Sequence, residues 1–215
     1  LFHLSVNDSN KWKVIIDDFK LFNADFFGQE SYLKIDNKPV VYLYWSKSLR
    51  GDVPIFLDKI RETSKKSIFF ICDYAEPGSA TWIKEGHPLI EEYVKYFDGW
   101  STWTAGWPDP HVQEPVEENF PYFLEKGYSV WSELANKYNR YFIPSIIPGF
   151  INLRDLSYPI LPRNLKMFNK ELEVALQYAS SPTKNVSIIR VDTFNEFGEA
   201  TGIEPTQKED YSYIE

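Results

Sequence analysis

The sequence has little of what disulfide-bonded, metal-binding and membrane proteins depend on. It contains one cysteine, three histidines and no long apolar run among its 215 residues. The one cysteine, Cys72, excludes a disulfide framework within the chain, and its position in the apolar run SIFFIC predicts a packed thiol. The dispersed histidines offer no metal-binding cluster, and no apolar run approaches the roughly 18 residues that a membrane span requires. A phosphate-binding glycine loop and a Ser–His–Asp arrangement are also missing. We therefore expect no metal, no cofactor and no membrane span.

Positive charge is in deficit as well. The 23 Lys and Arg residues against 31 Asp and Glu residues give a net charge of −8 and a pI of about 5.0. This charge would repel nucleic acid, so we expect no nucleic-acid partner. The length suffices for one sizeable core, and we expect residues 1–215 to form a single domain. The chain begins at Leu1 without a methionine or a signal-peptide pattern, so we expect N-terminal residues to be missing and assign no compartment.

Aromatic residues, in contrast, are abundant. They make up 17% of the chain, with 7 Trp and 14 Tyr. Aromatic rings fill protein cores, and they also present flat apolar faces to the C–H faces of pyranose sugars. Composition alone leaves both interpretations open.

Five short apolar or aromatic segments have the pattern of strands that are buried on both faces. They span residues 40–45, 67–73, 99–103, 141–146 and 186–193. Helical patterns precede and separate them, at residues 10–22, 53–65, 88–97, 115–138 and 162–179. A break in the fourth of these helices is expected near Gly127. Strands that alternate with helices predict an α/β fold with a parallel sheet or barrel.

The connections between these segments are unequal in length. Helix-to-strand connections are short, whereas three strand-to-helix connections are long and rich in Pro, Gly and aromatic residues: DYAEPGSATWIKEGH, TAGWPDPHVQE and IPGFINLRDLSYPIL. Long loops at the carboxyl ends of parallel strands are typical of the active-site face of a (β/α)8 TIM barrel. Five strands do not close such a barrel, so we expect the chain to cover only its C-terminal five or so βα units. An open α/β sheet is the alternative.

The last predicted strand leads into TFNEFGE, which places the carboxylates of Glu196 and Glu199 three residues apart. Asn195 can orient the first, and Gly198 permits the close approach of a ligand. Retaining glycosidases use two carboxyl groups about 5–5.5 Å apart, and residues at i and i+3 in a helical turn have Cβ atoms about 5–6 Å apart. The spacing therefore predicts an acid/base pair, with a solvated helix face as the alternative.

The segment NEFGEATGIEP resembles the N-E-W-[HG]-E-G-T-x-I-E-P segment of glycoside hydrolase family 99, the endo-α-mannosidase family, and of its broader relatives in bacterial glycan assembly. YLKIDNKPVVYLY is similar to the family's Y-L-x-I-x-G-K-P-V segment, and SIIPGFINLR followed by LPRN also matches. The resemblance extends in islands over residues 30–206. It implies a (β/α)8 barrel without a metal, acting on an oligosaccharide or polysaccharide.

The resemblance also implies roles for the two carboxylates. By motif position, Glu196 is the base that deprotonates the sugar's own 2-hydroxyl, which then attacks C1 to give a 1,2-anhydro sugar. Glu199 is the acid/base that protonates the leaving oxygen, and the anomeric configuration is retained. The implied activity is hydrolysis of an α-linked glycan, either a mannoside or a related hexoside.

Three positions depart from the family pattern. Phe197 stands in place of Trp, Ala200 in place of Gly, and Gly198 where endomannosidases carry His. Because the Gly198 variant is common among the glycan-assembly relatives, the alternative is a transferase-like or carbohydrate-binding protein of polysaccharide biosynthesis.

Further candidate substrate-binding residues lie at the ends of predicted strands and in the long loops. They are Tyr44, Trp45, Asp73, Trp103, Trp107 and His111. The tryptophans can stack on a sugar or pack at the rim of the barrel. Asp73 can contact a substrate hydroxyl or cap a turn. His111 is a surface histidine or a site residue.

Other residues have a structural interpretation. Alternation places Trp100 in the core, and Asp98 precedes Gly99 as a turn residue. Arg154 and Arg163 can hold a carboxylate or phosphate, although salt bridges to the many acidic residues are the simpler interpretation.

Overall fold

The structure is a computed structural model that describes residues 4–5, 9–44, 46, 49–64, 67–73, 94–103, 116–153, 160–182, 187–208 and 210–214. The chain divides into two compact units. Unit 1 comprises Leu1–Tyr74 and Pro88–Trp100, and unit 2 comprises Ala75–His87 and Ser101–Glu215. Strand β6 (Gly99–Thr102) begins in unit 1 and ends in unit 2. The single domain expected from the chain length stays a prediction.

The strands of unit 1 follow the order β2-β3-β5-β6. Strands β2 (Lys34–Ile35) and β3 (Lys38–Leu43) form an antiparallel hairpin, while β5 (Phe69–Asp73) runs parallel to β3. The two residues of the hairpin turn, Asp36 and Asn37, have φ values of 50° and 60°. Asp and Asn tolerate this left-handed conformation, which a two-residue hairpin turn requires.

Two helices complete unit 1, α1 (Ser9–Asp25) and α2 (Val53–Thr63). Helix α2 begins at an N-cap, because Asp52 Oδ1 accepts a hydrogen bond from Ile55 N–H at 3.1 Å. The core of this unit is aromatic and aliphatic. Its fully buried side chains include Phe27, Leu57, Ile60, Phe69, Phe70 and Phe97. A short parallel pair, β1 (Leu4–Ser5) with β4 (Leu49–Arg50), is also present.

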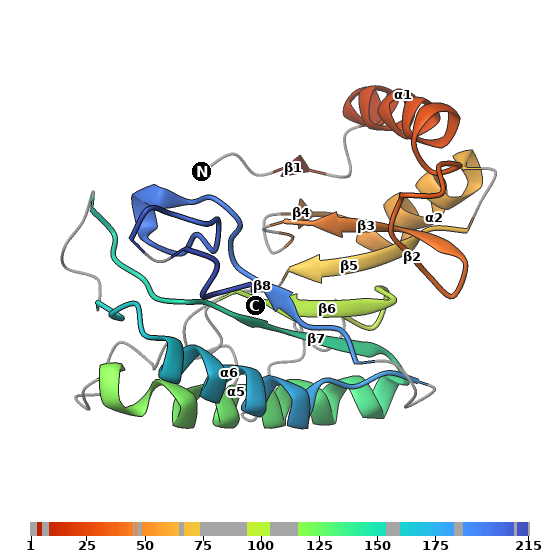
Figure 1. Cartoon of the computed structure of the whole chain (residues 1–215). Helices are drawn as coiled ribbons and strands as arrows, with labels where there is room; N and C mark the ends of the chain where they lie inside the picture. The colour runs from red at the N-terminus through yellow and green to blue at the C-terminus, as the bar shows by residue number, and fades with distance from the viewer. Residues whose placement is uncertain are drawn as a thin grey trace. The chain divides into compact units, whose positions relative to one another are not determined.

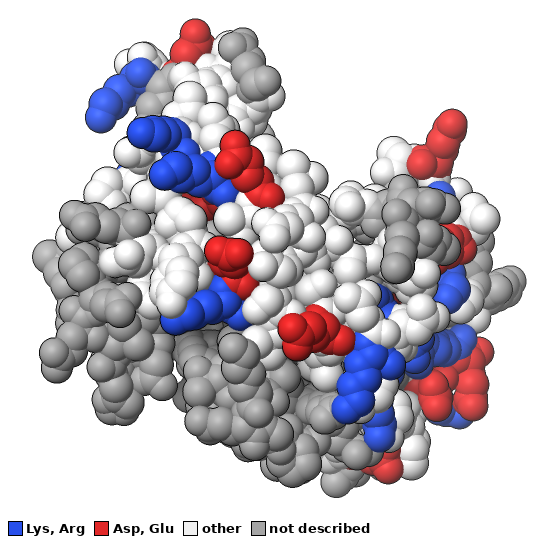
Figure 2. Space-filling view, turned by 90° about the horizontal axis from the view of Figure 1, so that it is seen from below, with Lys and Arg blue, Asp and Glu red and all other residues white. Residues whose placement is uncertain are grey.

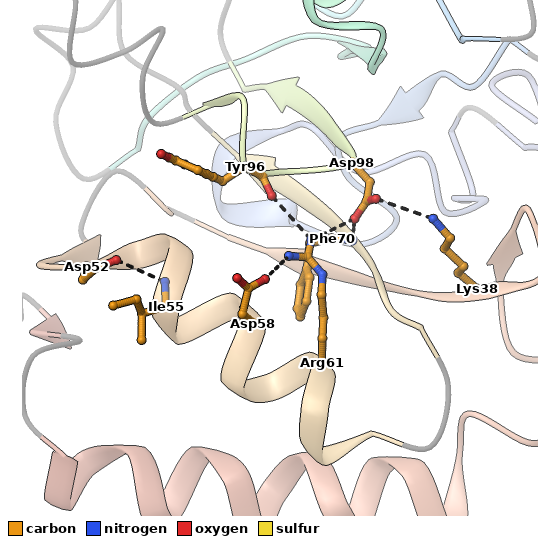
Figure 3. A network of polar contacts seen from close by, with 8 residues as sticks. All are labelled: Lys38, Asp52, Ile55, Asp58, Arg61, Phe70, Tyr96 and Asp98. Carbon is orange, nitrogen blue, oxygen red and sulfur yellow. Dashed lines mark hydrogen bonds and ion pairs between the residues drawn. The ribbon is translucent and has the colours of Figure 1, made fainter.

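Asp98 is the centre of a polar network in unit 1 (Figure 3). Its Oδ2 accepts hydrogen bonds from Phe70 N–H at 3.0 Å and from Arg61 Nη2 at 3.3 Å, and Lys38 Nζ lies 3.7 Å from Oδ1. Arg61 also donates to the carbonyl of Tyr96 at 3.4 Å, and its guanidinium lies over the Phe70 ring. These contacts attach helix α2 to strand β5. Asp98 is therefore a structural residue, as its position before Gly99 predicts.

The strands of unit 2 follow the order β6-β7-β8. Strand β7 (Tyr141–Ile146) is parallel to β8 (Arg190–Val191). Helices α5 (Val116–Tyr138) and α6 (Leu165–Tyr178) lie side by side along β7 (Figure 1). Tyr128 and Phe142 pack edge to face across this layer, with ring centroids 5.5 Å apart. Parallel strands with helices packed against them give an α/β fold that is consistent with part of a TIM barrel.

Most predicted elements are present, and two of them differ from the prediction. Strand β8 is limited to two residues instead of the predicted 186–193, because its ladder with β7 contains only two residue pairs and the chain then turns into a loop. Helix α5 continues through Gly127 without the expected break. The predicted helix at 88–97 lies mostly outside the described residues.

The described surface carries charges of both signs. On the face in Figure 2, basic and acidic side chains are interspersed among uncharged ones, so no single-sign field dominates that view. In the part of the chain that the structure describes, none of the helices combines the length and apolarity that a bilayer crossing requires.

Candidate functional site

The segment that follows β8 is a closed loop, which we call the glutamate loop (residues 193–204). Backbone hydrogen bonds join its two arms: Thr193 N–H donates to Thr201 O at 2.9 Å and Ile203 N–H donates to Thr193 O at 3.0 Å. A third bond runs from Glu204 N–H to Phe194 O at 2.7 Å. The hydroxyls of Thr193 and Thr201 also lie 3.0 Å apart. These bonds hold the tip of the loop in a defined conformation at the carboxyl end of a parallel strand.

Glu196 lies at the start of the turn that forms this tip, the 3-10 helix η2 (Phe197–Glu199). Its Oε1 accepts a hydrogen bond from Gly198 N–H at 3.0 Å, so the side chain caps its own turn. Its backbone N–H donates to Thr193 Oγ1 at 3.0 Å. The carboxylate is thus exposed to solvent but fixed in direction.

Glu199 ends the same turn in a different environment. Its side chain is half-buried, and its carbonyl accepts a hydrogen bond from Ile151 N–H at 2.9 Å. The structure therefore places both glutamates in one 3-10 turn but gives them unequal access to water. That they act as a catalytic pair stays a prediction.

Exposed aromatic rings flank Glu196. Phe194 is 58% exposed and Phe197 is 60% exposed, and Asn195 between them is also exposed. The two rings therefore give the tip of the loop an apolar surface beside the Glu196 carboxylate. From the sequence, Phe197 is notable only as a departure from a motif, and Phe194 is not singled out. The signal that could have found both is their position on either side of the Asn–Glu pair in the sequence.

Arg163 holds the second arm of the glutamate loop. Its Nη1 donates to the carbonyls of Ala200 at 2.8 Å and Gly202 at 2.7 Å, and its guanidinium lies over the ring of Tyr213 at 4.6 Å. A Cβ at Gly149 would approach Arg163 to 2.8 Å, so the glycine makes room for the arginine. The sequence favoured salt bridges for this residue, whereas these contacts are with backbone carbonyls, which carry no sequence signal.

A buried carboxyl group contacts the backbone just after the end of β7. Glu171 of α6 is 1% exposed, and its Oε2 accepts a hydrogen bond from Ile147 N–H at 3.0 Å. Burial raises the pKa of Glu171 to about 8. At neutral pH the group is therefore mostly protonated. Its hydrogen bond holds the backbone at Ile147, and four residues later Ile151 N–H donates to the carbonyl of Glu199. Glu171 could not be identified from the sequence, because a single glutamate in an amphipathic helix has no distinctive pattern.

The remaining predicted site residues divide between the two units. In unit 2, Trp103 is half-buried, with its ring 6.0 Å from that of Phe150. In unit 1, Asp73 ends β5 fully buried, its carbonyl accepting a hydrogen bond from Ser46 Oγ at 2.9 Å, while Tyr44 after β3 is 68% exposed. Their roles stay predictions. Trp45, Trp107 and His111 lie outside the described residues.

Two structural predictions near these residues are confirmed. Trp100 has no exposed surface. Cys72 is buried too, and burial raises the pKa of its thiol well above the usual value. In the described ranges, no three His, Cys, Asp or Glu side chains are grouped so that they could hold a metal ion.

The sequence matches no protein-family profile and no curated protein. Solved structures do match. A structure described as a glycoside hydrolase-like protein superposes with a TM-score of 0.73 at 17% identity, over 95% of this chain and 57% of that one.

Two structures of the GH99 endo-α-mannosidase from Bacteroides thetaiotaomicron also match. One, in complex with bis-tris-propane, has a TM-score of 0.57 at 18% identity, over 90% of this chain and 55% of the other. The second has a TM-score of 0.58 at 19% identity, over 98% and 58%. This chain therefore spans just over half the length of these structures. The comparisons show a glycoside hydrolase-like fold similar to that of GH99.

Proposed function

We propose that this chain forms part of a retaining glycoside hydrolase that cleaves an α-linked glycan, a mannoside or a related hexoside. The observation that carries the proposal is the placement of Glu196 and Glu199 at one hydrogen-bonded turn at the carboxyl end of a parallel strand. Active sites of barrel enzymes are built at this end of the strands. The glycoside hydrolase-like fold supports the same assignment.

The two glutamates have unequal environments that suit different roles. Glu196 is exposed and accepts a backbone hydrogen bond, as a carboxylate base does. Glu196 takes the proton from the sugar's 2-hydroxyl, O2 bonds to C1, and the C1–O bond to the leaving group breaks as Glu199 protonates the departing oxygen. Water then attacks C1 and gives its proton to Glu199, while the C1–O2 bond breaks and O2 recovers the proton from Glu196. The two inversions at C1 retain the anomeric configuration.

Phe194 and Phe197 supply a surface for the sugar in this proposal. Their exposed rings lie on either side of Glu196 in the sequence and can pack against pyranose C–H faces. Arg163 and Thr193 hold the backbone that carries the glutamates, so the pair is positioned before substrate binds.

The test is hydrolysis of α-mannan and α-glucan oligosaccharides by the protein, followed by NMR of the anomeric protons. We expect the α-configured product to appear first. Glu196→Gln should reduce the rate by about 10²–10⁴-fold, the usual contribution of a general base. Glu204→Gln, which removes a charge from the same loop, is the matched control and should retain activity. Initial release of the β-anomer would contradict the proposal.

A 2-O-methyl substrate tests the participation of the sugar's hydroxyl. Without an O2–H bond, the 1,2-anhydro route is blocked, so we expect no turnover although the substrate still binds. Unchanged hydrolysis of this substrate, with a sugar-modified glutamate detected by mass spectrometry, would instead indicate direct nucleophilic attack by a carboxylate.

The second candidate is a transferase-like or carbohydrate-binding protein of polysaccharide biosynthesis. Gly198, in place of the histidine of endomannosidases, favours it. This candidate predicts that a nucleotide sugar is required for any reaction and that α-linked oligosaccharides alone are not cleaved.

A further inference from the structure

A polar pocket lies in unit 2 at the ends of helices α5 and α6, which run side by side (Figure 1). Its volume is about 290 Å³. Ser132 and Asn136 of α5 line one side, and Gln177 and Tyr178 of α6, with Ser181 beyond it, line the other. No function assigned above uses these residues.

The pocket is separate from the glutamate loop. Ser180, at its wall, pairs through the backbone with Phe142 near the start of β7. The glutamate loop follows β8, which pairs with Ser145 and Ile146 at the other end of β7. A strand rises about 3.3 Å per residue, so these two attachment points lie roughly 10 Å or more apart along the sheet.

The lining is neutral and rich in groups that both donate and accept hydrogen bonds. It consists of serine hydroxyls, side-chain amides and one tyrosine, and none of the described lining residues carries a charge. The charged groups that act on the lining are the carboxylates of Glu125, which accepts a hydrogen bond from Tyr178 Oη at 3.3 Å, and of Glu133, so an anion is disfavoured. An apolar ligand would leave the hydroxyls and amides unpaired. Hydroxyl groups of a neutral polyol match both their donors and their acceptors.

Ser181 provides the second, independent observation. It is 5% exposed, and its Oγ has no hydrogen-bond partner among the described residues; the Oγ of Ser180 is in the same situation. A buried polar group without a partner costs about 1–3 kcal/mol. A hydroxyl that enters the pocket would remove this cost.

We propose that the pocket is a second, non-catalytic carbohydrate site that binds one neutral pyranose residue. Its volume lies near the lower end of the roughly 300–1,000 Å³ typical of ligand pockets, as expected for a single sugar ring. Tyr178 lines the pocket beside these amides and hydroxyls, and an aromatic residue is a common partner for the C–H groups of a sugar. The proposal does not require that the protein cleaves glycans.

The test is NMR titration of the Glu196→Gln protein with methyl α-mannopyranoside and methyl α-glucopyranoside. We expect saturable shifts of the side-chain amide signals of Asn136 and Gln177, with Kd in the millimolar range typical of a single weakly held ligand. Inorganic phosphate should cause none. Shifts that increase linearly without saturation, or that are confined to the glutamate loop, would overturn the proposal.

Variants separate binding from folding. Ser181→Ala removes a hydroxyl that has no partner in the free protein, so it should fold with an unchanged or higher Tm while weakening sugar binding about five- to tenfold. Ser129→Ala is the matched control, because the Oγ of Ser129 is bonded to Lys126 O and does not line the pocket. Equal sugar affinity in Ser181→Ala and the parent protein would also overturn the proposal. Hydrolysis by the parent protein is measured separately, so either proposal can fail while the other holds.

Discussion

Glu196 and Gly198 depend on each other at the scale of single residues. The Gly198 N–H fixes the Glu196 carboxylate, and a Cβ built on Gly198 would lie 2.9 Å from Glu196 Oε1. That contact is too close, but the side-chain carboxylate can move away from it. The direction in which the Glu196 carboxylate points therefore depends on Gly198 having no side chain.

We predict that Gly198→Ala lowers hydrolysis while leaving stability almost unchanged. The added methyl group displaces the carboxylate, and misplacement of a catalytic group by about 1 Å can cost 10²-fold in rate. The site is exposed, so the free energy of unfolding should change by less than roughly 0.5 kcal/mol. Steady-state kinetics and thermal unfolding measure the two effects.

The control for this change is Gly28→Ala, where a Cβ meets nothing within 4 Å. It should change neither quantity. Full activity of Gly198→Ala would show that the Glu196 carboxylate need not point where the structure places it, and would weaken its assignment as the base.

Single residues also show what the sequence could predict. The glutamate pair could be proposed from the sequence because its spacing and motif are visible there, and the structure adds that both residues lie at one 3-10 turn. The left-handed conformation of Ala200, with φ of 55°, explains why the related motif has Gly there, but only the structure reveals it. The role of Arg163 could not be predicted, because its partners are backbone carbonyls that any residue type would provide.

At the scale of elements, the strands in the centres of the units were predicted best. The bounds of β7 are those predicted, because all six of its residues are buried and apolar or small. The two-residue strand β2 was missed, since so short a segment has no period to detect. Strand β8 was predicted too long because its β-branched sequence suits a strand, whereas Val191 is 37% exposed and the chain leaves the ladder there. Local propensity was overridden by the tertiary arrangement.

Arg163 connects two such elements, the chain before α6 and the glutamate loop. We predict that Arg163→Met lowers the free energy of unfolding by about 2–4 kcal/mol, because two charge-assisted hydrogen bonds to the carbonyls of Ala200 and Gly202 are lost. Amide hydrogen exchange of Thr193 and Ile203 should accelerate, since the opposite arm of the loop loses its anchor.

Lys166→Met is the matched control for the Arg163 variant. It removes an exposed cation three residues further along the chain, from the first turn of α6, without touching the loop. Exchange rates at Thr193 and Ile203 should then stay unchanged. If Arg163→Met leaves those rates unchanged as well, the arginine does not hold the loop and the backbone bonds between its arms suffice.

At the scale of the whole molecule, the fold class was predictable and the division into two units was not. Alternating strands and helices with long loops after the strands indicated part of a TIM barrel, and solved glycoside hydrolase structures share this fold over 90–98% of the chain. The division into two compact units left no sign in the composition. The buried polar groups of unit 2, such as Glu171, were equally invisible.

Glu171 makes the stability of the protein depend on pH in a direction opposite to that of ordinary salt-bridged carboxylates. Its pKa is raised from 4.5 to about 8 in the folded state. Between these values the folded state binds the proton and the unfolded state does not. This contribution to stability is therefore complete below about pH 4.5, falls by roughly 1.4 kcal/mol per pH unit above it and levels off above about pH 8.

We predict that Glu171→Gln, which keeps an oxygen for Ile147 N–H but cannot ionise, removes this fall. The measurement is the free energy of unfolding by urea from pH 5 to 8, taken as the difference between variant and parent, because other groups titrate in both.

Glu173→Gln, an exposed change two residues further along α6, should reproduce the pH dependence of the parent. Parallel curves for Glu171→Gln and the parent would mean that Glu171 is ionised in the folded protein, and that water or a group outside the described residues reaches its second oxygen.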